Sequence, residues 1–147
     1  MTDETRRITD LVELHALCSR YMLLCSQLIE DRWLEVFTPD GTYNAFGAVY
    51  GLDRFPALLE AAPRGQFIGN MPVVDVDVDS DRATGKQHFV FIDQATHDMR
   101  LGWYNDEYLR TADGWRIRRR STTFMRKHGG FDSGAAHDPL ADAEKKT

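Results

Sequence analysis

The stretch LGWYNDEYLR (101–110) combines the aromatic residues of a buried strand with several groups that can exchange protons. Side chains alternate along a strand, so Tyr104, Asp106 and Tyr108 share one face and Asn105 lies on the other. A carboxylate between two phenols can accept a proton from carbon and help to protonate a leaving oxygen or halide. We therefore predict Asp106 as a catalytic base.

The arginine-rich run RIRRR (116–120) offers a structural alternative for Asp106. Alternation places Arg116, Arg118 and Arg120 together on one face, which is typical of a solvated outer surface. An ion pair between one of these arginines and Asp106 would make the acid structural rather than catalytic. The sequence leaves both interpretations open.

His88 is a second candidate base, because an imidazole titrates close to neutral pH. It lies in the strand-like segment GKQHFVFID (85–93), in which one register directs His88 into a pocket and the other directs Gln87. Tyr21, on a predicted helix, can donate a hydrogen bond to a substrate oxygen or pack in the core. We count His88 and Tyr21 among the candidate catalytic residues.

The composition fits one globular domain without a nucleic-acid or membrane partner. The chain has 147 residues, of which 42% are hydrophobic and 28% charged, and its net charge is -5. Dispersed basic residues at that net charge argue against nucleic acid. The start lacks an apolar signal region, and no stretch approaches the roughly 20 apolar residues of a membrane helix. We expect a soluble, cytoplasmic protein.

No cofactor or metal ion is predicted. The dinucleotide motif GxGxxG, the Walker A phosphate loop and the GxSxG motif are absent. Cys18 and Cys25 lack the partners of a zinc site, and on one helix they would lie about 10 Å apart, beyond the reach of a disulfide. We interpret both as small core residues in a reducing compartment.

The hydrophobic spacing predicts helices in the first half of the chain and strands in the second. Apolar residues recur at helical spacing from Ile8 to Ile29, with Thr5 or Thr9-Asp10 as a cap. Turn residues and β-type alternation mark the other boundaries. The predicted elements are a long helix (8–29), a short helix (30–37) ended by TPDG, a hairpin around Gly47, a helix (52–62) and four strands (66–79, 83–93, 99–111 and 115–126).

These elements predict an α+β domain over residues 1–127, with helices packed on one face of an antiparallel meander. Pro72 cannot donate a ladder hydrogen bond, so the first long strand must bulge there or lie at an edge. The tail 128–147 loses periodicity and gains Gly, Ala and charge. We expect it to be mobile or to cover a partner subunit.

Three segments, RYMLLCSQLIEDRWLEVFTPDGTY (20–43), GQFIGN (65–70) and GWYNDEYLRTADGWRI (102–117), together resemble the SnoaL-like branch of the nuclear transport factor 2-like superfamily. The likeness spans residues 8 to about 126. It implies a cone-shaped fold in which a curved antiparallel or mixed sheet wraps a long N-terminal helix, with two further short helices and a pocket at the open end. It also implies a homodimer or homotrimer assembled through the outer sheet face.

Several candidate site residues follow from this resemblance. Scytalone dehydratase and hexachlorocyclohexane dehydrochlorinase, enzymes of this branch, pair an Asp on the first helix with a His in a His-aromatic-x-Gly segment. This chain has Ser26 and Gln66 at those two positions, and neither side chain can shuttle a proton. Tyr21 matches the tyrosine beside that Asp, and Tyr43 matches an aromatic of the pocket wall. The resemblance implies that Ser26, Tyr43 and Gln66 contact the substrate.

Asn105 matches a catalytic pocket asparagine if positions are counted from Asp113-Gly114. Counting from Trp115 selects Tyr104 instead, as a substrate-binding residue. On a strand, this difference of one residue exchanges the pocket face for the outside.

For function, the resemblance implies a choice among related chemistries and binding roles. The leading hypothesis is a cofactor-independent lyase or isomerase of the dehydratase, dehydrohalogenase or retro-aldol type, acting by acid/base chemistry. Its small-molecule substrate would be largely apolar and aromatic or alicyclic, as in the catabolism of aromatic compounds. Two alternatives are a non-catalytic small-molecule-binding domain, since both positions of the usual pair are replaced, and a small structural subunit of a ring-hydroxylating dioxygenase.

Overall fold

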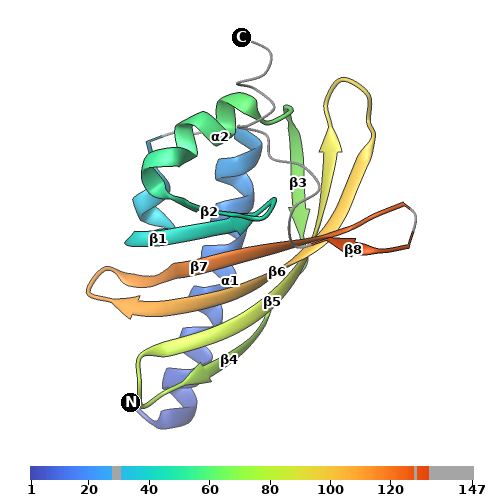
Figure 1. Cartoon of the computed structure of the whole chain (residues 1–147). Coiled ribbons are helices and arrows are strands. Elements are labelled where there is room, and N and C mark those ends of the chain that lie inside the picture. The colour runs from blue at the N-terminus through green and yellow to red at the C-terminus, as the bar shows by residue number, and fades with distance from the viewer. Residues whose placement is uncertain (28–30, 128, 133–147) are drawn as a thin grey trace.

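The structure, a computed structural model, describes residues 1–27, 31–127 and 129–132 (Figure 1). Within these residues, a long helix and short helical segments lie against one eight-stranded sheet. No helix in the described part of the chain is both long and apolar enough to cross a membrane. The elements are α1 (Asp3–Gln27), η1 (Trp33–Glu35), β1 (Phe37–Ala45), β2 (Ala48–Gly51), η2 (Leu52–Arg54), α2 (Phe55–Ala61), β3 (Gly65–Gly69), β4 (Val73–Asp77), β5 (Arg82–Asp93), β6 (Met99–Thr111), β7 (Gly114–Met125) and β8 (Phe131–Asp132).

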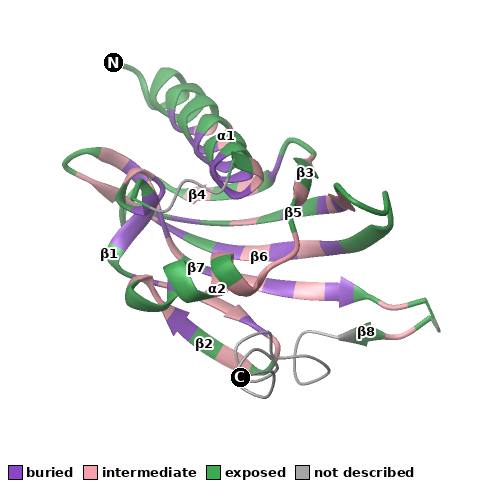
Figure 2. Cartoon of the chain, turned by 90° about the horizontal axis from the view of Figure 1, so that it is seen from above, coloured by how far each residue is buried: buried purple, intermediate pink, exposed green. Residues whose placement is uncertain are grey.

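The strands form a curved, mixed sheet that stays open. Its order is β2-β1-β7-β6-β5-β3, with β4 also paired to β5 and β8 to β7. Neighbouring strands pair antiparallel, except that β1 and β7 are parallel. Figure 1 shows α1 crossing one side of the sheet, and Figure 2 shows the buried side of α1 turned toward the strands. This arrangement confirms the predicted α+β fold with a curved sheet around the first helix.

α1 begins at Asp3, earlier than the predicted start at Ile8, because the Thr5 N–H donates to Thr2 Oγ1 at 3.1 Å and caps it. The predicted helix end at Ile29 lies outside the described residues. One stripe of α1 is buried against the sheet, as expected of an amphipathic helix. It consists of Asp10, Leu14, Leu17, Cys18, Tyr21, Met22, Leu24 and Cys25, and both cysteines are free thiols as predicted.

The predicted short helix over 30–37 is wrong for most of its length. Its described part contains only the 3-10 turn Trp33–Glu35, and Phe37 already belongs to β1. The TPDG segment does not end a helix but forms a kink inside β1. Gly41 permits this kink, because a Cβ there would lie 2.8 Å from the carbonyl oxygen of Thr38.

The predicted strand over 66–79 is divided into β3 and β4, and both pair with β5 at the edge of the sheet. Pro72 lies in the gap between them, where the sheet requires no hydrogen bond from a backbone N–H. Asn70 replaces part of the missing ladder, because its Oδ1 accepts a hydrogen bond of 2.8 Å from the backbone N–H of His88. The expectation that Pro72 sits at an edge or a bulge thus matches the structure.

The predicted tail, 128–147, falls largely outside the described residues, which end at Asp132. Its described part contains β8, in which Phe131 pairs with Met125 of β7. The sheet therefore continues beyond the predicted domain boundary at 127.

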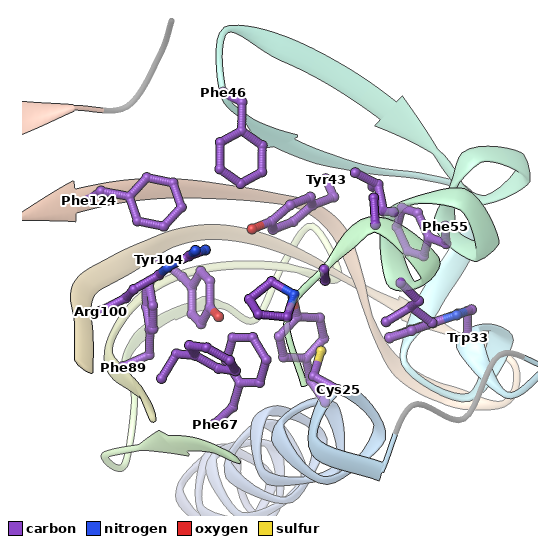
Figure 3. A pocket seen from close by; sticks show the side chains of 17 residues that line it. Cys25, Trp33, Tyr43, Phe46, Phe55, Phe67, Phe89, Arg100, Tyr104 and Phe124 are labelled. Atoms are coloured by element: carbon purple, nitrogen blue, oxygen red, sulfur yellow. The ribbon is translucent and has the colours of Figure 1, made fainter. Parts of the chain in front are cut away.

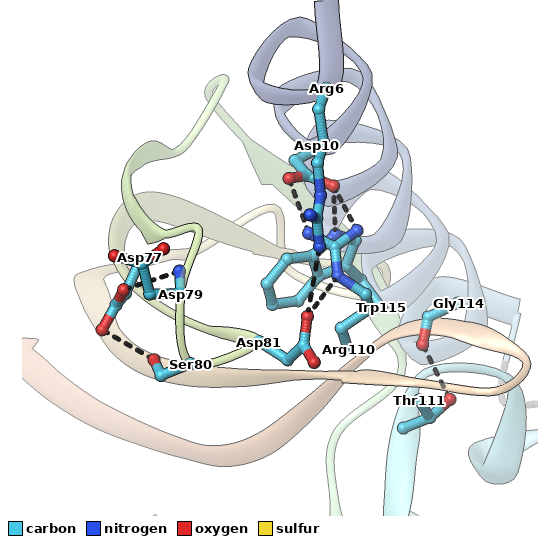
Figure 4. Close-up of polar contacts among 10 residues, drawn as sticks. All are labelled: Arg6, Asp10, Asp77, Asp79, Ser80, Asp81, Arg110, Thr111, Gly114 and Trp115. Carbon is cyan, nitrogen blue, oxygen red and sulfur yellow. Dashed lines mark hydrogen bonds and ion pairs between the residues drawn. The ribbon is translucent and has the colours of Figure 1, made fainter. Parts of the chain in front are cut away.

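An ion-pair network fastens the N-terminal half of α1 to the sheet (Figure 4). Arg110 of β6 donates two hydrogen bonds to the Asp10 carboxylate, one of them 2.7 Å long, and one of 2.9 Å to Asp81. Trp115 Nε1 also donates to Asp10, at 3.0 Å. Asp10 is only 1% exposed. The hydrogen bonds from Arg110 are the largest cause that holds the pKa of Asp10 below its ordinary value of 3.8.

Asp10→Asn is expected to lower the free energy of unfolding by about 2 kcal/mol at pH 7, because Arg110 loses its buried ionic partner. Since the pKa of Asp10 is lowered in the folded state, its contribution is complete above the ordinary pKa and is lost as pH falls through the folded one. The difference between the two proteins should therefore shrink below about pH 4. Urea unfolding at pH 7 and pH 3 measures it, and a difference independent of pH would contradict this role. As a control, Asp81→Asn removes an exposed partner and should cost less than about 1 kcal/mol.

Candidate functional site

A half-open pocket lies between α1, the β1–β2 hairpin, α2 and the inner face of the sheet (Figure 3). Its cavity volume is about 140 Å³. We call the part formed by residues 43–63 the roof, and the part formed by α1, β3, β5, β6 and β7 the floor. With Trp33, the roof residues Tyr43, Phe46, Phe55, Leu58, Leu59, Ala61, Ala62 and Pro63 and the floor residues Tyr21, Cys25, Phe67, Phe89, Phe91, Arg100, Tyr104 and Phe124 line the pocket.

Two tyrosine hydroxyls in the pocket are able to donate a hydrogen bond to a ligand. Tyr43 accepts a hydrogen bond of 2.9 Å from Thr122 Oγ1, which leaves its own proton available. The Tyr104 hydroxyl has no hydrogen-bond partner within the described residues, and Figure 3 shows its oxygen among the lining side chains. The Tyr104 ring stacks on Phe89 with centroids 4.6 Å apart, which fixes its direction. The pocket therefore offers two positioned donors.

These hydroxyls keep their protons at neutral pH. Burial is the largest cause in each case: it raises the pKa of Tyr43 to about 12 and the pKa of Tyr104 well above its ordinary value. Burial likewise raises the pKa of the Cys25 thiol to about 12. The tyrosines thus act as hydrogen-bond donors, and Cys25 is not a thiolate nucleophile.

A buried ion pair lies behind the tyrosines. The Arg120 guanidinium donates to the two Asp106 oxygens at 2.8 and 2.7 Å, and both side chains are 0% exposed. The Tyr108 hydroxyl donates to Asp106 at 2.7 Å, and Gln87 Oε1 accepts from Arg120 at 3.1 Å. The Asp106 carboxylate thereby accepts three hydrogen bonds from two side chains, so the sequence-based alternative of an ion pair with an arginine of 116–120 is the one observed.

The Arg120 guanidinium is also held between two rings that line the pocket. Its Cζ lies 4.2 Å from the ring centroid of Tyr21 and 4.1 Å from that of Tyr104. Such cation–π contacts fix both rings and place a positive charge beside them. Among the described atoms, Nη1 of Arg120 is buried without a hydrogen-bond partner. The guanidinium is therefore the member of the ion pair that contacts the pocket-lining rings.

Arg120 points inward because β7 contains a β-bulge. Ile117 and Arg119 pair with consecutive residues of β6, so Arg118 is an extra residue without a partner there. Inward-facing positions are odd before the bulge, as at Ile117, and even after it. This corrects the prediction that Arg116, Arg118 and Arg120 share one solvated face.

Three of the predicted site residues, Tyr21, Tyr43 and Tyr104, line the pocket together. Asp106, predicted as the base, lies on the same inner face of β6 as Tyr104 but behind the pocket, in its ion pair with Arg120. We therefore assign Asp106 a positioning role through Arg120 rather than contact with a ligand.

Ser26, predicted to contact the substrate, instead connects α1 with β3. Its hydroxyl donates to the Met22 carbonyl at 2.8 Å and accepts from the Phe67 N–H at 2.9 Å. The Ser26 hydroxyl thus acts both as a donor and as an acceptor within the protein. Ser26 is a structural residue next to the site.

Gln66, His88 and Asn105 lie outside the pocket lining, so the structure does not bring them together with Tyr21, Tyr43 and Tyr104. Gln66 and His88 are exposed, and Asn105 is half-buried on the outer face of β6. Strand alternation explains this: Phe89 is buried on the inner face, so its neighbour His88 must face outward, and Tyr104 excludes Asn105 in the same way.

Sequence reasoning did not identify most of the pocket lining or the inward position of Arg120. Phe67 lines the pocket in place of its neighbour Gln66, and Phe89 and Arg100 also line it. Alternation counted back from Tyr104 would have assigned Arg100 to the inner face. The inward position of Arg120 required knowledge of the bulge.

The described part of the pocket lining contains no carboxylate and no imidazole. Within the same residues, no group of three or more His, Cys, Asp or Glu side chains is placed to hold a metal ion. The functional groups that the lining does offer are hydroxyls, a neutral thiol, an indole N–H and one guanidinium.

One comparison with known proteins identifies the family of this chain. Residues 6–121 match the SnoaL-like domain. The uncharacterized protein Rv2910c of Mycobacterium tuberculosis is 34% identical over 130 residues, which cover 79% of this chain and 86% of that protein.

Solved structures share the fold. An NTF2-like protein with a cystatin-like fold from Novosphingobium aromaticivorans is 23% identical, with a TM-score of 0.74 over 84% of this chain and 87% of its own. LinA is 16% identical, with a TM-score of 0.73 over 92% of this chain and 97% of its own. The match over most of the chain, the open curved sheet and the aromatic pocket lead to one conclusion: this chain belongs to the family of SnoaL-like domains.

Proposed function

We propose that this protein is a cofactor-independent lyase or isomerase that acts on a small ligand built around one aromatic or alicyclic ring. The aromatic lining and the cavity of about 140 Å³ support this ligand class, since an apolar cavity of roughly 150 Å³ accommodates benzene. The resemblance to a branch that contains dehydratases and dehydrochlorinases, together with the fold shared with LinA, supports an enzymatic role.

The observation that carries this proposal is the pair of donors, Tyr43 and Tyr104, beside the buried charge of Arg120. Both hydroxyls can donate to one substrate oxygen while negative charge develops on it, either on a carbonyl oxygen as the neighbouring C–C bond breaks or on a leaving oxygen as its C–O bond breaks. Donors that are already oriented in a site of low dielectric stabilise such an oxyanion without reorganisation. Arg120 acts through the rings rather than on the substrate.

The missing base limits the reaction classes. Because no described lining residue can accept a proton from carbon, the acceptor in the proposed step is water at the open mouth or a basic group of the substrate. This favours retro-aldol cleavage of a β-hydroxycarbonyl compound. Its hydroxyl proton passes to the acceptor, the C–C bond electrons pass to the carbonyl oxygen, and the resulting enolate is held by the two tyrosines until it is protonated.

A second candidate function is non-catalytic binding of the same class of ligand. It is favoured by the positions of Ser26 and Gln66, neither of which reaches the pocket. A binding domain needs the apolar pocket and the two donors but no proton acceptor.

One experiment separates these functions. Wild-type protein and the double variant Tyr43→Phe/Tyr104→Phe are incubated with the same metabolite extract and followed by mass spectrometry. Depletion of one compound with the appearance of a new one in the wild type alone supports the lyase or isomerase. Co-purification of an unchanged compound with the wild type supports the binding domain and ends the enzymatic proposal. If no compound is converted and none co-purifies with the wild-type protein, both proposed functions are contradicted.

A further inference from the structure

Arg100 is a charged residue at the edge of the pocket that the proposed reaction does not use. It lies near the start of β6, four residues before Tyr104 and on the same inner face of the strand. Its side chain lines the pocket, although the residue is exposed. Its strand partner is Phe91, and its Cζ lies 5.8 Å from the centroid of the Phe91 ring. The guanidinium therefore reaches from an exposed strand end to the aromatic lining (Figure 3).

The guanidinium of Arg100 is available to a ligand. Within the described residues it has no ion pair and no hydrogen bond, unlike Arg110 and Arg120, which each hold an acid. The cation–π contact of its Cζ with the Phe91 ring involves the face of the guanidinium and leaves the donors at its edge free.

The charges around the pocket are unbalanced toward positive. Arg120 is matched by Asp106 and both are buried, so that pair contributes no net charge. The described lining contains no acidic side chain. The Asp93 carboxylate, outside the lining, interacts electrostatically with Arg100 but forms no ion pair with it, and it accepts hydrogen bonds from the backbone N–H groups of Ala95 and Thr96. A ligand with one negative group would correct this, and a guanidinium binds a carboxylate through two parallel hydrogen bonds.

We propose that the ligand is an aromatic or alicyclic monocarboxylate, whose ring enters the pocket and whose carboxylate pairs with Arg100 at the mouth. This inference rests on the proposed function for the identity of the site, and it specifies the substrate class. The ring packs among Phe67, Phe89, Phe91 and Phe124, and the carboxylate stays in partial contact with water. The end of the ligand opposite the carboxylate then faces the hydroxyls of Tyr43 and Tyr104.

The test compares two probes of equal size, benzoate and benzamide, by isothermal titration calorimetry at pH 7 and low salt. Wild-type protein should bind benzoate about five- to tenfold more tightly than benzamide. Arg100→Gln should abolish this preference and leave benzamide binding within about twofold, whereas Arg100→Lys should keep part of it. Added salt should weaken benzoate binding only.

The matched control is Arg82→Gln, which removes the same charge from an exposed position. Arg82 begins β5, at the end of that strand away from Phe91, the strand partner of Arg100. It should leave the preference for benzoate unchanged. The inference is overturned if benzamide binds as tightly as benzoate, if the preference survives in Arg100→Gln, or if neither probe binds. Because these measurements involve no turnover, a preserved preference in a protein that converts nothing would remove the proposed enzymatic function alone.

Discussion

Replacing Arg120 by methionine is expected to lower the free energy of unfolding by about 3–5 kcal/mol. The substitution leaves the fully buried Asp106 carboxylate with Tyr108 as its remaining side-chain donor. It also removes the cation held between Tyr21 and Tyr104. Thermal and urea unfolding measure the loss, which for a chain of this size corresponds to a fall in Tm of about 10 °C or more.

Two variants make this result specific. Arg119→Met removes the neighbouring arginine, which forms an ion pair with Glu107 at 2.6 Å. Both side chains of this pair are about half-exposed, so the substitution should lower the free energy of unfolding by less than about 1 kcal/mol. The double variant Arg120→Met/Asp106→Leu removes both buried charges and should recover much of the lost stability. If Arg119→Met and Arg120→Met cost the same, Arg120 does not have the buried role assigned to it.

Tyr104→Phe is expected to lower kcat about 10²-fold on the substrate identified from the metabolite experiment. The change removes one oxygen that has no partner within the described protein, so the fold should keep its stability while the developing oxyanion loses a donor. Steady-state kinetics measure the loss, with unfolding experiments on the same sample to show that the variant is intact. KM should change little, because the hydroxyl acts mainly in the transition state.

His88→Ala serves as the kinetic control, because this exposed imidazole on the outer face should affect kcat by less than about twofold. A large loss in His88→Ala together with a small loss in Tyr104→Phe would reverse the assignment of the inner face. It would also restore the histidine as the proton acceptor that the described lining does not contain.

Local patterns were sufficient for the long strands. The segments 83–93 and 99–111 were predicted within a residue of β5 and β6, because alternation of aromatic and β-branched residues is strong where one face packs on a helix. The segment 30–37 was misread as a helix because Trp33, Val36 and Phe37 have helical spacing. Their burial instead comes from packing around a kinked strand, which depends on contacts distant in sequence.

The candidate site was harder to predict, because one residue of register decides which face of a strand is inside. The period-2 rule placed Tyr104 and Asp106 on a common face, but it assigned Arg120 to the outside since it assumes an unbroken β7. A clue was present in the sequence: Trp115 and Ile117 are apolar at odd positions, whereas Phe124 is apolar at an even one. Such a change of phase within one strand indicates an inserted residue.

The carry-over from related enzymes failed at Gln66 for a different reason. The alignment gave the position in the chain, but Phe67 rather than Gln66 faces inward at this point of β3. An alignment gives the position of a residue in a motif, but the direction of its side chain depends on how β3 pairs with β5.

The roof has a consequence for how new ligand preferences could arise. Apart from Tyr43 at its start, it is one continuous segment, 46–63, and it shares no residue with the buried ion pair or with Tyr104. Exchanging that segment between homologues would change the size and shape of the ligand that fits, while the groups that polarise it stay as they are. The size and shape of the ligand can therefore change through segment 46–63 while Tyr43, Tyr104 and the buried ion pair stay the same.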